Sequence, residues 1–256
     1  MKQPTTGHSV QRKLNLDDSR KVARLWKIAR LAMDSFQHSD EQTKVQKTVG
    51  VLDFTSCPSD GIVLDASCGV GHLLNVRNID TRKWYYSDGD QAMVDCILES
   101  LSPGYPALDI RRSFWHEIPE HFHKILFDRI IILGNSLPYV CNWTDDKPEA
   151  QILTESIIAL RNSLTAIFTA LKPHGKFLFD LTEDLKYRFG LSPVIFEGRI
   201  LHPFIHAEHT NGIRYWHFGT EQDEHLIKGL ALDIEMLRSL LLEVGFQKIE
   251  LVPEKF

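Results

Sequence analysis

This chain of 256 residues has little cysteine, no long apolar run and no excess of positive charge. Its four cysteines form no CxxC pair, which argues against a zinc knuckle and a disulfide framework. No stretch of about 18 apolar residues occurs, so we expect no transmembrane helix. The net charge of −5 gives no overall attraction to nucleic acid. These absences favour a reduced, cytoplasmic setting without membrane or nucleic-acid partners.

The remaining composition is that of an ordinary globular protein, with 43% hydrophobic and 25% charged residues. The first residues, MKQPTTGHSVQRKLNLDD, are polar and lack the apolar segment of a signal peptide. No linker rich in proline, glycine and serine divides the chain. We therefore expect a single domain over residues 1–256, with residues 1–16 as a flexible tail.

Short apolar runs alternate with segments of helical periodicity as far as Leu181. Helices are expected at residues 19–32, 42–54 and 90–101, and a longer one includes Leu153, Ile157, Leu160, Leu164, Phe168 and Leu171 before KPHG ends it. Strands are expected at residues 62–65, 83–88, 109–114, 127–136 and 176–181. This alternation predicts an α/β fold, with a Rossmann-like, doubly wound and mostly parallel sheet.

The pattern changes after Leu181. Segments 194–201, 212–219 and 225–232 are rich in aromatic and β-branched residues, which is typical of antiparallel strands. We predict an antiparallel β insertion over residues 182–228, which covers the active site together with a helical lid over residues 17–56. A last helix is expected over residues 233–244, ending at Gly245, and then a strand in QKIELV, residues 247–252.

The stretch IVLDASCGVGHLL, residues 62–74, has the pattern of a strand, a tight turn and the start of a helix. Gly69 and Gly71 carry no side chain, so the backbone of this turn can touch a ligand. Asp88 ends the next strand, where an acidic residue commonly holds the hydroxyls of a ribose. Leu74 replaces the third glycine of a dinucleotide fingerprint, and no Gly-Lys-Ser/Thr phosphate loop is present. The pattern indicates a ligand with a ribose and no pyrophosphate, a description that S-adenosylmethionine (SAM) fits.

Several motifs, in the same order along the chain, resemble those of class I SAM-dependent methyltransferases. They are the glycine turn, YSDGDQAM (86–93), FDRIIILGNS (127–136) and LKPHGKFLFD (171–180). The resemblance implies SAM as the cofactor. It also implies that Asp88 and Gly89 lie at the ribose, Met93 near the adenine and Asp65 near the methionine part.

A narrower resemblance is to the glycine N-methyltransferase and glycine/sarcosine methyltransferase branch. It rests on LGNS (133–136) and on ARLWKIA (23–29). Matched residue by residue, the branch implies four further positions at the cofactor: Trp26, Ser67, Trp115 and, through its carbonyl, Leu133. Phe114 stands where the branch has an asparagine, and we expect it at the cofactor as well. It also implies that Asn135 faces the substrate.

Other positions depart from that branch. Thr182 stands where the branch has a substrate-gripping arginine, and Ala29 replaces a tyrosine of its N-terminal helix. Tyr139 replaces a histidine that follows LGNS. These differences argue against glycine as the substrate. The acidic Glu183 and Asp184 suit a cationic or amine-bearing small molecule instead.

We therefore predict an enzyme that transfers a methyl group to a small molecule, with an amine nitrogen favoured, by in-line displacement. Asn135 and Tyr139 are the predicted residues that orient the acceptor. Two alternatives stay open: methylation at oxygen or carbon, with His202 or His206 as the base, and a non-catalytic SAM-binding protein. No metal site is expected, because His202, His206 and His209 do not share one face of a strand. The oligomeric state also stays open, a homo-oligomer included.

Overall fold

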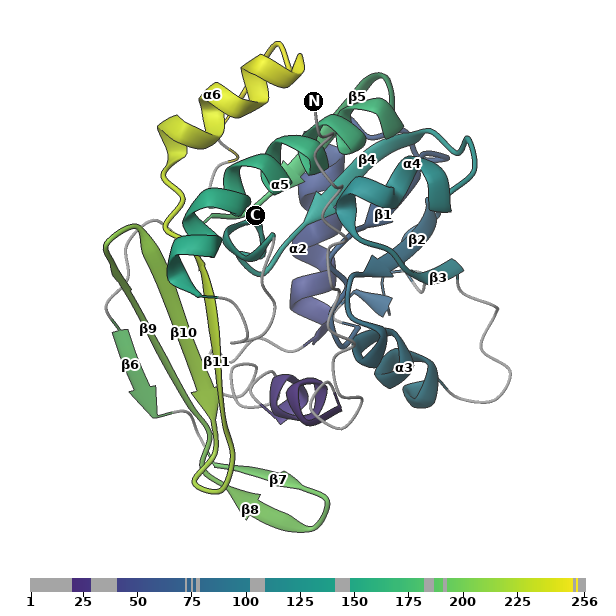
Figure 1. Ribbon diagram of the computed structural model, residues 1–256. Coiled ribbons are helices and arrows are strands. Elements are labelled where there is room, and N and C mark those ends of the chain that lie inside the picture. Colours follow the sequence, from purple (N-terminus) through teal and green to yellow (C-terminus); the bar gives the residue numbers. More distant parts are fainter. Residues whose placement is uncertain are drawn as a thin grey trace, which may run out of the picture.

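The computed structural model describes residues 20–28, 41–71, 73, 74, 76, 79–101, 109–140, 148–181, 187–190, 193–250 and 252. Its centre is a sheet of five parallel strands (Figure 1). The strands are β1 (Ile62–Asp65), β2 (Lys83–Asp88), β3 (Asp109–Arg112), β4 (Phe127–Ile132) and β5 (Leu171–Phe179). Their spatial order is β3-β2-β1-β4-β5, so the winding reverses between β1 and β4. The predicted Rossmann-like sheet is confirmed.

Helices cover both faces of this sheet. They are α2 (Glu41–Phe54), α3 (Gln91–Ser100), α4 (Ile118–His121), α5 (Glu149–Ala170) and α6 (Ile234–Val244), with short 3-10 helices η2 (Trp115–Glu117) and η3 (Leu137–Tyr139). Successive strand residues point to opposite faces. Leu64 and Ile130 therefore pack in one cluster with α5 and α6, whereas Val63 and Ile131 pack in another with α2 and α3. Burial on both faces explains why these strands are continuous apolar runs.

Capping residues set the ends of two helices where the sequence predicts them. Asp90 caps α3 by accepting a hydrogen bond from the amide of Ala92 at 2.8 Å. Asp233 caps α6 by accepting from the amide of Met236 at 2.7 Å. Gly245 ends α6 with a φ of 122°, a backbone conformation that favours glycine.

The long helix α5 forms as predicted, but its buried face is rotated from the predicted one. Leu160 and Leu164 are buried as expected, together with Ile152 and Ile167. Leu153 and Phe168 remain 39% and 42% exposed. At the helical period of 3.6 residues both lie on the border of the stripe that faces the sheet. The predicted face is wrong because apolar residues spaced three and four apart along a helix fall on two neighbouring stripes of its surface, and the spacing alone does not say which stripe is buried.

Three predicted segment boundaries are wrong. Within the described residues after Gly71, positions 73, 74 and 76 form turns and 3-10 structure rather than an α-helix. The helix α5 ends at Ala170, before KPHG as expected, but β5 begins at Leu171 instead of residue 176, and KPHG forms an irregularity in its pairing with β4. Residues 247–250 form no strand. The chain is anchored before them by Phe246, whose ring packs on Phe168 and Phe177, and most of residues 247–250 are exposed.

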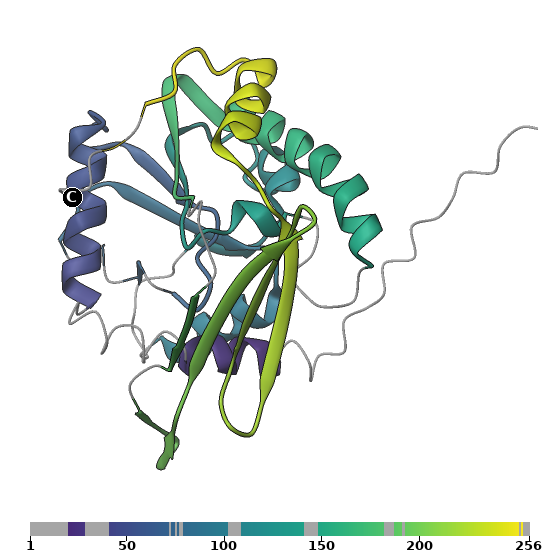
Figure 2. The ribbon, with the colours of Figure 1, turned by 90° about the vertical axis from the view of Figure 1, so that its left-hand side faces the viewer.

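A second sheet is antiparallel, as the sequence predicts. Its strands are β6 (Tyr187–Gly190), β9 (Phe204–Thr210), β10 (Ile213–Gly219) and β11 (Glu224–Leu230), in the order β11-β10-β9-β6. A hairpin of β7 (Val194–Phe196) and β8 (Arg199–Leu201) extends from it, as Figures 1 and 2 show. The side-chain period of two divides β10: Trp216 and Phe218 point into the molecule, while Tyr215 and His217 belong to the other face.

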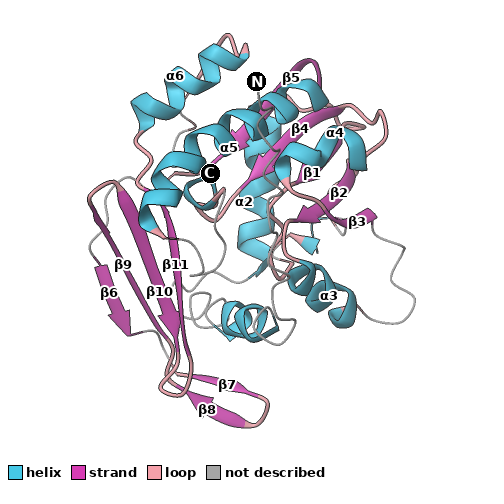
Figure 3. Ribbon diagram, in the orientation of Figure 1, coloured by secondary structure: helices cyan, strands magenta, loops and turns pink. Residues whose placement is uncertain are grey.

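Residues 20–28 form a helix between the two sheets, drawn in purple in Figures 1 and 2. One apolar cluster contains Val22 and Leu25 of this helix, Met93 of α3 and Ile205 of β9. The cluster also includes Val70 from the glycine turn. The helix is therefore held by tertiary contacts across the end of the parallel sheet. Figure 3 shows it lying beside α3. Within the described ranges, no helix combines the length and apolarity needed to cross a bilayer.

Candidate functional site

The candidate site lies at the carboxyl ends of β1, β2 and β4, where the winding of the sheet reverses and ligands commonly bind. The turn after β1 is fixed by backbone bonds: Ala66 donates to the carbonyl of Ile131 at 2.9 Å and Cys68 to that of Ser87 at 3.0 Å. Gly71 has a φ of 91°, and a Cβ there would lie 2.5 Å from the side chain of Leu74. Only glycine fits this position, so the turn brings bare backbone to the edge of the sheet.

Asp88 closes this turn from β2. One oxygen of its carboxylate accepts from the amide of Gly69 at 2.9 Å, and the other accepts from the amide of Asp90 at 3.0 Å. The helix cap is Asp90, so Asp88 is not needed for that function. Each carboxylate oxygen can accept a second hydrogen bond. Asp88 therefore has acceptor capacity for two ligand hydroxyls, in an orientation fixed by the backbone.

Two carboxyl groups are partly or wholly removed from solvent at this edge: Asp65 is buried and Asp88 is half-buried. Burial is the main cause that raises the pKa of Asp65 to about 7, with the amide of Ser67 opposing it and the charge of Asp88 adding to it. Burial likewise raises the pKa of Asp88 to about 6, against the amides of Asp90 and Gly69. Both pKa values rise because an ionised carboxylate is poorly solvated here. A cationic ligand would compensate this charge, so the site favours positive charge.

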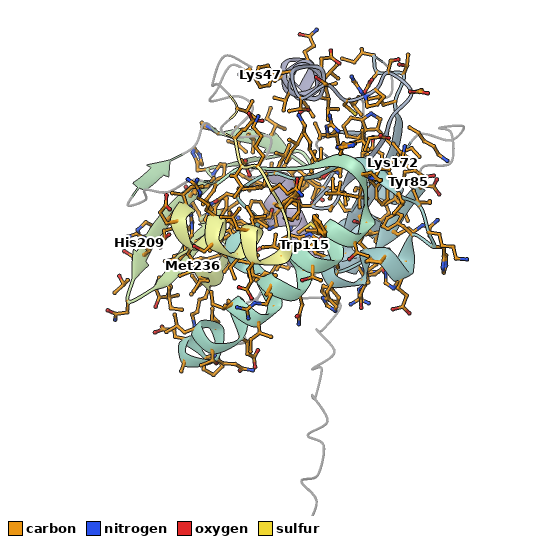
Figure 4. The ribbon with its side chains drawn as sticks, turned by 90° about the horizontal axis from the view of Figure 1, so that it is seen from above. Lys47, Tyr85, Trp115, Lys172, His209 and Met236 are labelled. Atoms are coloured by element: carbon orange, nitrogen blue, oxygen red, sulfur yellow. The ribbon has the colours of Figure 1, made fainter. Side chains whose placement is uncertain are left out.

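The aromatic residues after β3 lie beside this carboxyl pair. A Cβ on Gly89 would lie 2.8 Å from the ring of Phe114, so the missing side chain lets that ring rest on the backbone. The guanidinium of Arg112 lies 4.7 Å from the centre of the same ring. Trp115 is buried in the interior beside α5 (Figure 4), and its indole nitrogen donates to the carbonyl of Ala66 at 2.7 Å. Trp115 therefore supports the glycine turn from within the core.

Leu133, directly after β4, is linked to the glycine turn through Ser67. The amide of Leu133 donates to the hydroxyl of Ser67 at 3.0 Å. The carbonyl of Leu133 accepts from the hydroxyls of Ser67 at 3.2 Å and Ser136 at 2.8 Å. A carbonyl oxygen has two lone pairs, so a ligand amino group at this carbonyl requires one hydroxyl to turn away. The structure thus brings Ser67 and Leu133 together, and their place at the cofactor stays a prediction.

Asn135 and Tyr139, the predicted acceptor residues, are both buried, at 5% and 2% exposure. Asn135 has a φ of 55°. The amide of Tyr139 donates to the carbonyl of Ser136 at 3.0 Å, which links the two positions through one short segment. Tyr139 packs against β11 so closely that a Cβ on Gly229 would lie 2.5 Å from its ring.

Trp26 covers this region from helix 20–28. Its ring centre lies 4.2 Å from that of Phe218 and 5.2 Å from that of Trp216. Trp216 in turn lies 6.1 Å from Tyr139, so one aromatic cluster joins the helix, β10 and the loop after β4. Met93 belongs to the same apolar cluster and is 7% exposed. The resemblance placed Trp26 and Met93 at the cofactor, and the structure brings both to the cover of this edge.

Sequence reasoning missed four residues of this arrangement: Trp216, Phe218, Gly229 and Asp180. The alternation in GIRYWHFG gives a usable signal for the first two, since Trp216 and Phe218 share one face of β10. Gly229 has no such signal, because its importance depends on Tyr139 of a distant segment. Asp180 was visible only as the last residue of LKPHGKFLFD.

Several predicted positions lie elsewhere. Ala29, Thr182, Glu183 and Asp184 are outside the described residues. His206 and His209 point to opposite faces of β9, and His209 lies on the outer part of the second sheet (Figure 4). His206 stacks on His217 at 5.5 Å instead. In the part of the chain that the structure describes, no three histidine, cysteine or acidic side chains gather in an arrangement that could hold a metal ion.

No protein-family model matches the chain, and no curated protein sequence matches it. Solved structures do match it. The sugar N-methyltransferase KedS8 from a Streptoalloteichus species has a TM-score of 0.61 and 14% identity, over 96% of this chain and 90% of its own. DesVI from Streptomyces venezuelae has a TM-score of 0.62 and 13% identity, over 88% and 89%. The amino pentose methyltransferase CalS10 from Micromonospora echinaspora, solved with SAM, has a TM-score of 0.57 and 13% identity, over 93% and 91%.

These similarities extend over nearly the whole chain at low identity, so they establish the fold. They do not support the narrower resemblance to the glycine N-methyltransferase branch. That resemblance depended on short motifs, LGNS above all, and glycine, asparagine and serine are common turn residues in any loop. The chain therefore has the Rossmann-like fold of class I SAM-dependent methyltransferases.

Proposed function

We propose that this chain is a SAM-dependent methyltransferase that acts on a small molecule, with an amine nitrogen as the favoured acceptor. The observation that carries the proposal is the carboxylate of Asp88. It is fixed by the amides of Gly69 and Asp90 at the switch point of the sheet, and it keeps acceptor capacity for two hydroxyls. A ribose presents two neighbouring hydroxyls of that kind.

The residues at the edge fit SAM in two further respects. The glycine turn offers backbone without a Cβ at Gly69, where a Cβ would meet only the carbonyl oxygen of Ser67, at 4.0 Å, so a ligand can approach closely. The buried Asp65 and the half-buried Asp88 make the environment favourable to a cation. Bound SAM supplies an activated methyl group on a positively charged sulfur.

The cover of the site supports a small acceptor. Trp26, Tyr139 and Trp216 come from three separate segments and form one aromatic cluster over this region. A polymer would need an open groove, whereas a small molecule can be enclosed. KedS8 is a sugar N-methyltransferase and CalS10 an amino pentose methyltransferase, and MtfA, a glycopeptide N-methyltransferase solved with the product S-adenosylhomocysteine (SAH), matches at a TM-score of 0.50. They support an amine on a sugar-like molecule as the acceptor.

In this mechanism the chain positions the reactants and excludes water. Holding an acceptor nitrogen in line with the transferred methyl supplies about 7–11 kcal/mol in favourable cases. The amine has to be neutral to attack, and the desolvated surroundings of the buried Asn135 and Tyr139 favour the neutral form. Asn135 and Tyr139 orient the acceptor. No side-chain nucleophile is required.

Calorimetric titration tests the cofactor step. SAM and SAH should bind the wild type with micromolar affinity, and NAD should not bind. Asp88→Ala should lose the adenosyl ligands. The matched control is Asp90→Ala, which removes the side-chain cap of α3 two residues away, keeps the backbone amide that Asp88 accepts from, and should keep binding while the helix loses about 1 kcal/mol. Absence of adenosyl binding by folded wild type overturns the proposal.

The acceptor step is tested by incubating the enzyme and SAM with a panel of amino sugars, other primary amines and their hydroxyl analogues. Product masses and fragmentation then locate the added methyl group. Methylation of amino sugars but not of the hydroxyl analogues supports nitrogen as the acceptor. Methylation only at oxygen or carbon contradicts that part of the proposal and leaves the cofactor part standing.

A further inference from the structure

Asp180 follows β5 directly and reaches across to the loop after β4. Its amide donates to the carbonyl of Ile132 at 3.4 Å, which continues the pairing of the two strands by one residue. Its carboxylate accepts from the amide of Gly134 at 3.0 Å and from the amide of Asn135 at 2.7 Å. The two oxygens each take one of these bonds. Asp180 thus clamps two consecutive amides of one turn.

The turn that Asp180 clamps is unusual in its backbone. Gly134 and Asn135 both have positive φ, 76° and 55°. Asparagine tolerates this region better than most residues, but the conformation still needs support from its surroundings. Successive amides in such turns converge and form a cavity for an anion. Here the anion belongs to the chain itself, so the carboxylate of Asp180 stabilises a turn that would otherwise carry two converging donors.

The clamped turn leads straight to both predicted acceptor residues. It carries Asn135, and the hydroxyl of Ser136 and the amide of Tyr139 continue its bonding as far as η3. Asp88 lies on the other side of the switch point, at the end of β2, and holds different amides. Two carboxylates therefore hold the two sides of this edge, and no hydrogen bond given by the structure joins them.

We propose that Asp180 is a positioning residue for methyl transfer, which holds the Gly134–Asn135 turn in the conformation that presents Asn135 and Tyr139 to the acceptor. The inference rests on the proposed function. It predicts a separation: loss of the clamp impairs transfer and leaves cofactor binding intact. A residue with a general structural role would affect both.

The charge of Asp180 matters to the clamp, because ionised acceptors form hydrogen bonds about twice as strong as neutral ones. In the described residues no lysine or arginine forms an ion pair with it. Loss of solvation raises the pKa of its carboxyl group, although the residue keeps surface exposure, and the amides of Asn135 and Gly134 oppose that rise. Asp180→Asn keeps the shape and removes the charge, whereas Asp180→Glu keeps the charge and moves it by one methylene.

The first measurement needs no acceptor. In nitrogen-15 spectra of the full chain, the amides of Gly134 and Asn135 should shift together as pH falls from about 8 to 4, with one common midpoint above the ordinary value for aspartate. Asp180→Asn should abolish this shared titration. The matched control is Asp60→Asn, which removes the charge of an exposed acid and should leave the shared titration unchanged. If the amides of Gly134 and Asn135 titrate in Asp180→Asn as they do in the wild type, the proposed clamp is wrong.

The second measurement separates transfer from binding, with the amine from the panel that the wild type methylates. Asp180→Asn should lower kcat at least tenfold, keep SAH affinity within about threefold of wild type, and leave the unfolding transition cooperative. Asp180→Glu should recover part of the lost kcat. Unchanged kcat in Asp180→Asn, or a parallel loss of SAH affinity, overturns the inference. Failure of the wild type to bind SAH overturns the proposed function instead, and the amide titration still decides whether the clamp exists.

Discussion

The two sides of the candidate site are built in different ways. The cofactor half, defined as β1, the glycine turn, β2 and the cap of α3, belongs to one βαβ unit, and Asp88 joins its parts through Gly69 and Asp90. Hydrogen bonds with Ile131 and Trp115 support this unit from outside. The acceptor half, defined as residues 134–140 after β4, Asp180, helix 20–28 and the second sheet, joins distant segments, such as Asn135 with Asp180 and Trp26 with Trp216. The first half is therefore organised around one unit, while the second depends on the whole fold.

The comparison teaches where each kind of specificity resides. A nucleotide-binding turn needs particular backbone conformations within one βαβ unit, so motif and geometry coincide. An acceptor pocket needs only a surface of suitable shape, which many combinations of distant side chains can form. We therefore expect substitutions to affect the halves separately.

Asp88→Ala should give the largest effect and should act on the cofactor half alone. Loss of two hydrogen bonds to a charged acceptor is expected to cost about 3 kcal/mol, or roughly a hundredfold in the dissociation constant of SAH. Calorimetry measures this change. A dissociation constant within tenfold of wild type would contradict the assignment of Asp88 to the ribose.

Gly229→Ala should break the acceptor half. A Cβ there would lie 2.5 Å from the ring of Tyr139 and 2.6 Å from the carbonyl oxygen of Pro138, and the latter is backbone that cannot turn away. Overpacking of this kind costs about 1–3 kcal/mol of unfolding free energy. Urea denaturation measures the loss, and SAH affinity should change by less than about threefold.

The control for Gly229→Ala is Gly198→Ala in the turn between β7 and β8. There the new methyl group meets nothing within 4 Å, and only the positive φ of 74° opposes it. It should cost about 1 kcal/mol without loss of methyl transfer. If Gly229→Ala and Gly198→Ala affect methyl transfer equally, the role of Tyr139 in transfer does not depend on its packing against β11.

Acidification should weaken the cofactor half. Protonation of Asp88, whose pKa is about 6, removes the charged acceptor for the ribose hydroxyls. The dissociation constant of SAH should therefore rise about tenfold between pH 8 and pH 5. Titrations across this range measure the rise. A dissociation constant independent of pH would contradict the requirement for an ionised Asp88.

The stability of the cofactor-free protein should depend on pH in the opposite direction to SAH affinity, and should be greater at low pH. Folding raises the pKa of Asp65 from 3.8 to about 7, so the folded chain binds this proton more tightly than the unfolded chain. The corresponding stability is present at low pH and is lost as pH rises through about 7. Asp65→Asn removes the ionisable group, so its melting temperature should fall less than that of wild type between about pH 5 and 8. Parallel declines of wild type and variant would contradict the burial of this charge.

Salt should have the smallest effect. Lys21 pairs with Asp223 at 2.8 Å and Arg24 with Glu197 at 2.7 Å, which link helix 20–28 to the second sheet and its hairpin. Both pairs are solvent-exposed, and such pairs contribute at most about 1 kcal/mol. Raising the salt concentration to about 1 M should leave limited proteolysis of helix 20–28 nearly unchanged. Trp26→Ala should instead increase it clearly, because the apolar cluster holds the helix.

Local patterns in the sequence were enough to predict most elements of the central sheet and the arrangement of the glycine turn with Asp88. Apolar runs such as IVLD and FDRIII require burial on both faces, Asp90 and Asp233 supply caps, and two glycines and Asp88 sit at fixed positions of one βαβ unit. Each of these features acts over a few residues, so a local pattern is enough to reveal it.

The acceptor half, in contrast, could not be predicted, because it depends on packing between distant segments. The clamp by Asp180 joins the ends of β4 and β5, the cover by Trp26 depends on Trp216 far along the chain, and the role of Gly229 depends on Tyr139. Tertiary packing also fixed the buried stripe of α5 and left residues 247–250 outside any strand. The physical reason is the same in each case: contacts between distant segments depend on how the layers pack, and no local periodicity records that packing.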